Sequence, residues 1–223
     1  MTVPIYPSGT VRALLDTAHL TPATAHVLKH RLAQPHESLP RFFDAHAFAT
    51  LHAVCNRLLP QPDRADPIRI AAALDAGLAD DAGRGWRYAA MPPDGTAYRW
   101  GLQGVDECAK ALFNAPFQAL LDQQQDAVLS AIQQGDVAGG VWARLPAQAF
   151  FELLLVGAMN AYFVDLRAME EIGCVAMADV PGWVRVGLDQ LDAREPRLIR
   201  IEAATATATA TAPWPAPASA IDA

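Results

Sequence analysis

Hydrophobic residues recur at helical spacing along most of this 223-residue chain. The stretch that follows Asp44 has apolar side chains three or four positions apart, which places them on one face of a helix. Its apolar positions are Phe48, Leu51, Cys55 and Leu58. From Pro146 to about Phe163 the residues leave almost no polar side, so we expect this helix to be central and surrounded. The pattern predicts an all-α fold, a single helical domain of about six or seven helices.

Capping residues and prolines indicate where several of these helices begin. Thr21 is followed by Pro22, and Asp66 is followed by Pro67. A cap residue before a proline favours a helix start. Proline has no backbone N–H, but in the first turn of a helix this N–H would have no hydrogen-bond partner within the helix, so its absence costs nothing. Asp44 is a further cap residue. We therefore expect helices that begin at Pro22, near Asp44 and at Pro67.

Residues 80–100 interrupt the helical pattern with glycine, proline and aromatic residues. The pairs Pro92-Pro93 and Asp94-Gly95 are typical of turns. The aromatic residues of the segment are Trp86, Tyr88, Tyr98 and Trp100. A long aromatic loop is predicted, and it is either a functional surface or a loop held to the core by its own rings.

The two ends of the chain differ from its middle. Residues 1–40 form an N-terminal arm with one predicted helix, and residues 41–202 form the all-α domain. Residues 203–223 alternate threonine with alanine and end in a proline-rich stretch. Because these methyl groups bury too little surface to hold a strand, we expect a disordered C-terminal tail.

The composition favours binding to a protein over binding to nucleic acid. Hydrophobic residues make up 52% of the chain and charged residues only 18%, which leaves apolar surface for a partner. The net charge of −7 and the lack of a basic helix argue against a nucleic-acid surface. The longest apolar stretch is too short and too interrupted for a direct membrane span, and the start of the chain has no targeting signal.

No motif of established chemistry occurs in the chain. His26 and His30 lie four residues apart, a spacing that can bind a metal, but the adjacent glutamate of the zinc peptidase motif and a third ligand are missing. A solvated or interface histidine pair is the favoured interpretation. Nucleophile elbows, phosphate loops and dinucleotide fingerprints are absent. We expect no catalytic, cofactor-binding or metal-binding residue in this chain.

Five motifs occur in an order that resembles the gluconate 2-dehydrogenase subunit 3 family. They are HAVCNRLLPQPDRADPIRIAAALDAGL, GWRYAAMPPDGTAY, FNAPFQALLDQQQDAVL, AFFELLLVGAMNAYFVD and IGCVAMADVPGW. The resemblance covers roughly residues 42–196, and it rests on the order of the motifs more than on any one of them. It implies an accessory subunit that is not itself an enzyme.

The resemblance also implies a partner. The chain would bind and stabilise a large catalytic subunit of the glucose–methanol–choline oxidoreductase type, which carries FAD and oxidises sugars, sugar acids or alcohols. Electrons would then pass to a cytochrome subunit or another acceptor. Many relatives carry a twin-arginine export signal that this sequence does not show. The compartment is therefore open: cytoplasmic by that absence, or periplasmic or membrane-associated through partner subunits.

Trp86, Arg87, Tyr88 and Trp183 are the candidate partner contacts, because aromatic residues and arginine are enriched at interface hot spots. Packing in the core explains each of them equally well, Trp183 above all. The alternative function is a stand-alone helical protein that binds a metal or another ligand. It would use the histidine pair His26/His30 and the aromatic loop at residues 84–100.

Overall fold

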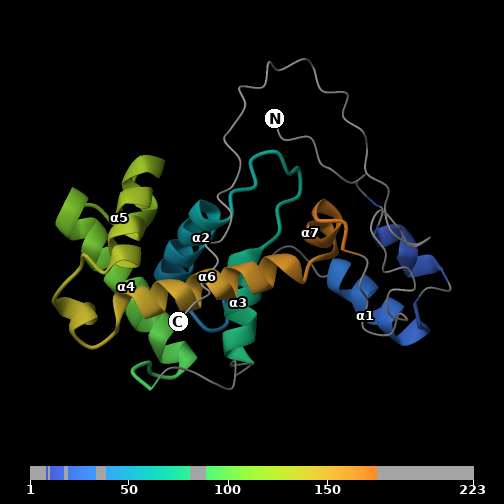
Figure 1. Cartoon of the computed structure of the whole chain (residues 1–223), viewed down its shortest axis with the longest axis horizontal. Coiled ribbons are helices and arrows are strands. Elements are labelled where there is room, and N and C mark those ends of the chain that lie inside the picture. The colour runs from blue at the N-terminus through green and yellow to red at the C-terminus, as the bar shows by residue number, and fades with distance from the viewer. Residues whose placement is uncertain (1–8, 10, 18–19, 34–38, 81–88, 175–223) are drawn as a thin grey trace, which may run out of the picture.

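The computed structural model describes residues 9, 11–17, 20–33, 39–80 and 89–174 (Figure 1). This part of the chain contains seven α-helices and three short 3-10 helices and no strand, which confirms the all-α prediction. The α-helices are α1 (Pro22–Leu32), α2 (Ala45–Leu58), α3 (Ile70–Ala79), α4 (Asp94–Phe113), α5 (Asp122–Gln134), α6 (Ala147–Phe163) and α7 (Leu166–Glu171). The 3-10 helices are η1 (Arg12–Asp16), η2 (Phe117–Ala119) and η3 (Gly140–Ala143).

Helix α6 lies at the centre of the main body, where it contacts α2, α3, α4 and α5 (Figure 1). Its Phe150 and Leu154 are fully buried. A Cβ atom on Gly101 would lie 2.0 Å from a ring carbon of Phe150. Glycine at this position therefore allows α4 and α6 to pack closely, and a larger residue there would displace the ring.

The predicted starts of two helices are confirmed. Thr21 caps α1, since its hydroxyl accepts the N–H of Thr24 at 3.4 Å. Asp44 caps α2 in the same way, by accepting the N–H of Ala47 at 2.8 Å. Both helices begin at the residue after the cap, as the sequence predicts.

The predicted start of the third helix is wrong. Helix α3 begins at Ile70, three residues beyond Pro67. The side chain of Gln61 explains the difference, because its amide accepts the N–H of Ile68 at 2.8 Å and donates to the Ile68 carbonyl at 3.0 Å. These bonds hold the backbone of Ile68 outside a helix, and the carboxylate of Asp66 pairs with Arg167 instead of capping.

The aromatic loop is shorter than predicted, because α4 begins at Asp94. Tyr98 and Trp100 therefore lie on a helix. Tyr98 is buried and its hydroxyl donates to the carbonyl of Leu153 at 3.4 Å. The guanidinium of Arg144 lies 4.1 Å from the centre of the Trp100 ring. These two rings belong to the packed body, which corrects the prediction for residues 94–100.

Helix α6 is central, but it is not fully surrounded by described residues. Its Met159 is 40% exposed and its Phe163 is 38% exposed. They lie four positions apart and so share one face of the helix. The expectation of a helix covered on all sides is therefore wrong for the C-terminal part of α6.

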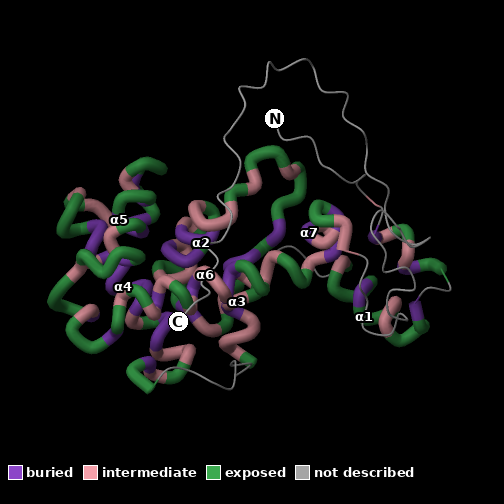
Figure 2. The backbone as a smooth tube through the Cα atoms, viewed as in Figure 1, coloured by how far each residue is buried: buried purple, intermediate pink, exposed green. Residues whose placement is uncertain are grey.

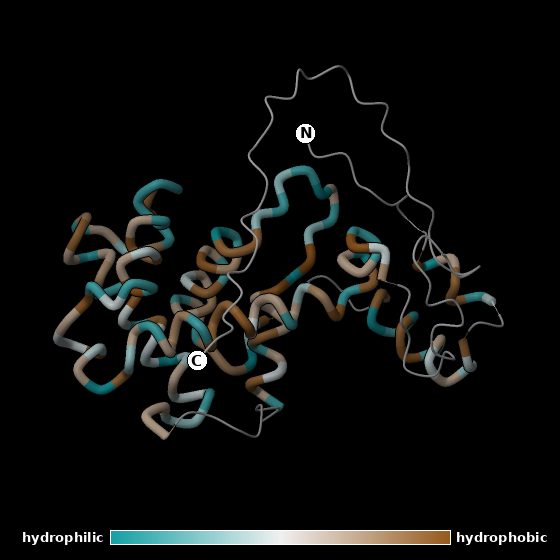
Figure 3. The backbone as a smooth tube through the Cα atoms, viewed as in Figure 1, coloured by the Kyte–Doolittle hydropathy of each residue, from teal (hydrophilic) through white to brown (hydrophobic). Residues whose placement is uncertain are grey.

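A second, smaller hydrophobic cluster joins the N-terminal arm to α7 (Figure 2). Its buried members are Val11, Leu15, Leu20, Leu28 and Leu166. Hydrophobic stretches accordingly occur both in the main body and on the side of α1 and α7 (Figure 3). The arm thus packs against α7, while the domain limits at residues 40 and 202 stay a prediction.

Candidate interaction surface

The candidate contacts Trp86, Arg87, Tyr88 and Trp183 lie outside the described residues. Their role in binding a partner stays a prediction. The predicted tail at residues 203–223 also lies outside the described part of the chain.

His26 and His30 both lie exposed on α1. Among the residues that the structure describes, no group of three or more histidine, cysteine, aspartate or glutamate side chains is placed to hold a metal ion. A metal ion held by His26 and His30 would need a further protein ligand that the described residues do not place beside them. The structure therefore adds no support to the alternative of a stand-alone metal-binding protein.

A closed ring of polar side chains joins α2, α4 and η2. The ring nitrogen Nε2 of His46 lies 2.6 Å from Oδ2 of the buried Asp106, and the amide of Gln118 lies 3.3 Å from His46 Nδ1. Thr50 donates to Gln118 at 2.8 Å and lies 3.3 Å from the same oxygen of Asp106. The N–H of Phe117 donates to Asp106 Oδ1 at 2.9 Å. Each of these polar side chains has a partner within the ring. The role of the ring is therefore to fix η2 against α2 and α4.

Sequence reasoning missed this ring, because its members lie up to 72 positions apart and form no motif. A buried carboxylate anchors a second connection in a similar way. Asp75 on α3 is 3% exposed and accepts the backbone N–H groups of Arg41, Phe42 and Phe43 at 2.6, 3.1 and 3.0 Å. Both carboxylates satisfy backbone donors that would otherwise be buried without a partner.

The cysteine thiols are suited to packing. All three are free, and burial raises the pKa of Cys55 to about 12. Burial also raises the pKa of Cys108, whose sulfur lies 3.2 Å from the indole nitrogen of Trp142. A thiol with a raised pKa is a poor nucleophile near neutral pH.

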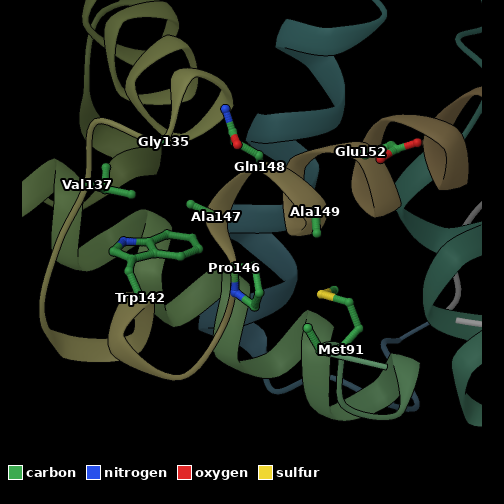
Figure 4. Close-up of a pocket in the computed structure, with 10 residues that line it drawn as sticks. Met91, Gly135, Val137, Trp142, Pro146, Ala147, Gln148, Ala149 and Glu152 are labelled. Atoms are coloured by element: carbon green, nitrogen blue, oxygen red, sulfur yellow. The ribbon is translucent and has the colours of Figure 1, made fainter. Parts of the chain in front are cut away.

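A cavity of about 570 Å³ opens between the end of α5 and the start of α6 (Figure 4). Trp142 and Val137 lie on one side of it, and Gln148 and Glu152 lie on α6. Two further hollows, of about 690 and 940 Å³, share Phe48, His52, Asn56 and Pro67 along the outer face of α2. The smaller of these two hollows is lined by Cys55 and His52, but burial raises the pKa of Cys55 to about 12, so this thiol is a poor nucleophile near neutral pH.

Exposed large apolar residues are concentrated where α6 meets α7. Met159, Phe163, Val164 and Ile172 are each more than a third exposed, and we call them the junction surface. Apolar residues that lie singly on a surface are ordinary, but a concentration within fourteen positions favours a contact site.

A network of ion pairs ties the loop before α3 to the junction of α6 and α7. Arg64 pairs with Glu171, whose carboxylate also accepts the hydroxyl of Tyr162 at 2.6 Å. Arg167 pairs with Asp66 at 2.5 Å and with Asp165 at 2.7 Å. Burial raises the pKa of Asp165, but hydrogen bonds from Arg167 outweigh it, so the pKa lies below its usual value. The network ties the junction of α6 and α7 to the loop before α3.

The family model of gluconate 2-dehydrogenase subunit 3 matches residues 45–182, which is more than half of the chain. This chain belongs to the gluconate 2-dehydrogenase subunit 3 family. The expectation drawn from the five motifs is thereby confirmed. No curated protein and no solved structure matches the chain.

The part shared with the gluconate 2-dehydrogenase subunit 3 family begins at Ala45, the first residue of α2. It includes α2 to α7, the polar ring partner Asp106 and the whole junction surface, whereas η1 and α1 lie outside it. In the described part of this chain, no helix combines the length and the apolar character needed to cross a membrane.

Proposed function

We propose that this chain is a non-catalytic accessory subunit that binds and stabilises a large dehydrogenase subunit, which carries FAD and oxidises a sugar, sugar acid or alcohol. Electrons would leave that catalytic subunit for a cytochrome subunit or another acceptor. The observation that carries the proposal is the family match over α2 to α7. The FAD belongs to the partner in this proposal, and no residue of this chain is assigned to it.

The physical character of the chain supports a binding role. In the described part of the chain, Arg167 forms structural ion pairs with Asp165 and Asp66, and the buried carboxylates of Asp75 and Asp106 accept backbone N–H groups. These groups hold the helices and loops of the chain together, which agrees with the binding role that we propose.

The junction surface is the contact that we assign to the catalytic subunit. Full burial of an exposed large apolar side chain contributes about 1.5–3 kcal/mol, and Phe163, which is 38% exposed, can contribute a part of this. The centre of an interface is also more apolar than its rim. Met159 and Phe163 present two such side chains on one helix face, so they form an anchor for a partner.

Co-expression with a large FAD-dependent dehydrogenase encoded in the same genome tests the proposal. The two chains should elute together from a size-exclusion column at micromolar concentration, with FAD absorbance in the shared peak. Separate elution contradicts the proposed function. Within a complex, Phe163→Ser should weaken binding at least tenfold, whereas Leu121→Ser serves as the matched control, since Leu121 is 74% exposed and lies at the start of α5.

A further inference from the structure

Glu170 is a buried carboxylate whose partners come from the opposite end of the chain. Only 4% of the surface of Glu170 is exposed to solvent. It accepts the backbone N–H of Gly9 at 2.9 Å and that of Arg12 at 3.0 Å. The guanidinium of Arg12 adds two parallel hydrogen bonds, from Nε to Oε1 and from Nη2 to Oε2, each 3.0 Å long. Such a two-pronged contact recognises an arginine specifically and would not be reproduced by a lysine.

Apolar side chains on both sides of Arg12 complete the contact. Val11 is fully buried and Leu15 is nearly so, and both belong to the smaller cluster with Leu166 of α7. The partly buried Met169 also packs against this cluster. The cluster is separate from the main one, so the arm and α7 share a small core of their own.

The two sides of this contact differ in their relation to the family. Helix α7 lies within residues 45–182, which match the family model, and the arm with η1 and α1 precedes them. The surface under the arm therefore belongs to the part of the chain that matches the family model, and the arm that covers it lies outside that part. The Glu170 carboxylate accepts a two-pronged contact from Arg12 and two backbone N–H groups, so this surface fits an extended segment that carries an arginine.

We propose that the face of α7 around Glu170 is a docking site for a short apolar segment that carries an arginine, and that the arm occupies it as a latch. The latch opens without unfolding the main cluster. In the closed state the arm competes with any other segment for the site on α7. Because the arm belongs to the same chain, its effective concentration at the site is in the millimolar range. Opening uncovers Leu166 and Met169, which lie two positions after Val164 and three positions before Ile172 of the junction surface.

The full-length variant Arg12→Glu tests the proposal, because two carboxylates at one buried site repel the arm. Amide signals of α7 in a ¹⁵N–¹H spectrum should shift, while those of α4 and α6 stay in place. The synthetic peptide PSGTVRALLDTAHL, which corresponds to residues 7–20, should then bind in trans and return the α7 signals toward their wild-type positions.

Three controls distinguish specific binding at this site from nonspecific binding of the peptide. The peptide with alanine in place of its arginine should bind to Arg12→Glu at least tenfold more weakly than the wild-type peptide does. The wild-type peptide should also bind at least tenfold more weakly to the double variant Arg12→Glu/Glu170→Gln. Arg31→Glu makes the same charge change on the exposed end of α1, and it should leave the α7 signals unchanged. Binding that does not depend on the arginine, or α7 signals that stay fixed in Arg12→Glu, overturns the proposal.

A milder variant covers the case in which Arg12→Glu fails to fold. Arg12→Lys keeps the charge but loses the two-pronged geometry. Hydrogen exchange of the arm amides should then rise at least fivefold relative to wild type, with α4 amides unchanged. Equal acceleration in the arm and in α4 would show that the arm is an integral part of the main fold, and no acceleration would show that Glu170 does not hold it; either result overturns the latch.

Discussion

The main body and the arm–α7 cluster are held together by different means. In the main body, large side chains such as Phe150 and Leu154 are fully buried between several helices. The smaller cluster has five buried apolar residues, and a buried carboxylate, Glu170, joins its two sides. Loss of packing is expected to unfold the first region, whereas loss of one ionic contact is expected to open the second.

The largest effect is expected from Phe150→Ala in the main body. The ring fills the space between α4 and α6, and removal of a buried phenylalanine side chain costs about 3–5 kcal/mol. Urea unfolding followed by circular dichroism should show this loss in a single transition that includes every helix of the body. A loss below about 1 kcal/mol would contradict the central position of this ring.

Glu170→Gln should have a smaller and local effect. Hydrogen bonds to a charged group are worth about 1.5–3 kcal/mol, and the lower part of this range is expected because the Arg12 side chain is 39% exposed and solvent screens it. Hydrogen exchange should accelerate for η1 and α1 amides and not for α4 amides. If α4 accelerates equally, the two regions do not differ as we describe.

Acid should open the arm contact before the main body unfolds. Burial raises the pKa of Glu170, but the hydrogen bonds and charge of Arg12 and the N–H of Gly9 outweigh it, so the pKa lies below its usual value of 4.5. A depressed pKa contributes stability that is present above the usual pKa and is lost as the pH falls through the folded-state pKa. The protection factors of the arm amides, which correct for the slower intrinsic exchange in acid, should therefore fall below about pH 4.5 in the wild type. In Glu170→Gln this pH dependence should be smaller, and an identical profile in both proteins would contradict the assignment.

The smallest effect is expected from Arg64→Ala at the junction of the two regions. Exposed pairs contribute about 0.2–1 kcal/mol. The Glu171 side chain is 45% exposed, but that of Arg64 is 17% exposed and also donates to the Tyr162 hydroxyl at 3.2 Å, so the upper end of this range is expected. Thermal unfolding should show a shift of a few degrees at most, and the shift should shrink in high salt. Arg31→Ala, at an exposed position on α1, is the control.

Local features of the sequence were sufficient for much of the fold. The caps Thr21 and Asp44 and the terminating Gly135, which has φ 78°, act within a few residues of themselves. Helical stripes likewise need only the spacing of apolar residues. The predicted start of the third helix at Pro67 was wrong, because the side chain of Gln61 accepts the backbone N–H of Ile68 and keeps Ile68 out of α3.

The candidate site was predictable only as a family resemblance. The junction surface was not foreseen, because an apolar helix such as α6 gives no indication of which side its neighbours leave open. The fate of Tyr98 and Trp100 was also missed, since Asp94 supports either a turn or the first turn of a helix. The predicted contacts Trp86, Arg87, Tyr88 and Trp183 stay predictions.

By itself, the sequence determined that the chain is helical, where α1 and α2 begin and to which family it belongs. Only the tertiary structure decided which charges meet. Arg12 and Glu170 lie 158 positions apart, and His46 and Asp106 lie 60 apart. The physical reason is that helix formation depends on neighbours along the chain. The pairing of a buried carboxylate depends on which donors the fold brings within about 3 Å of it.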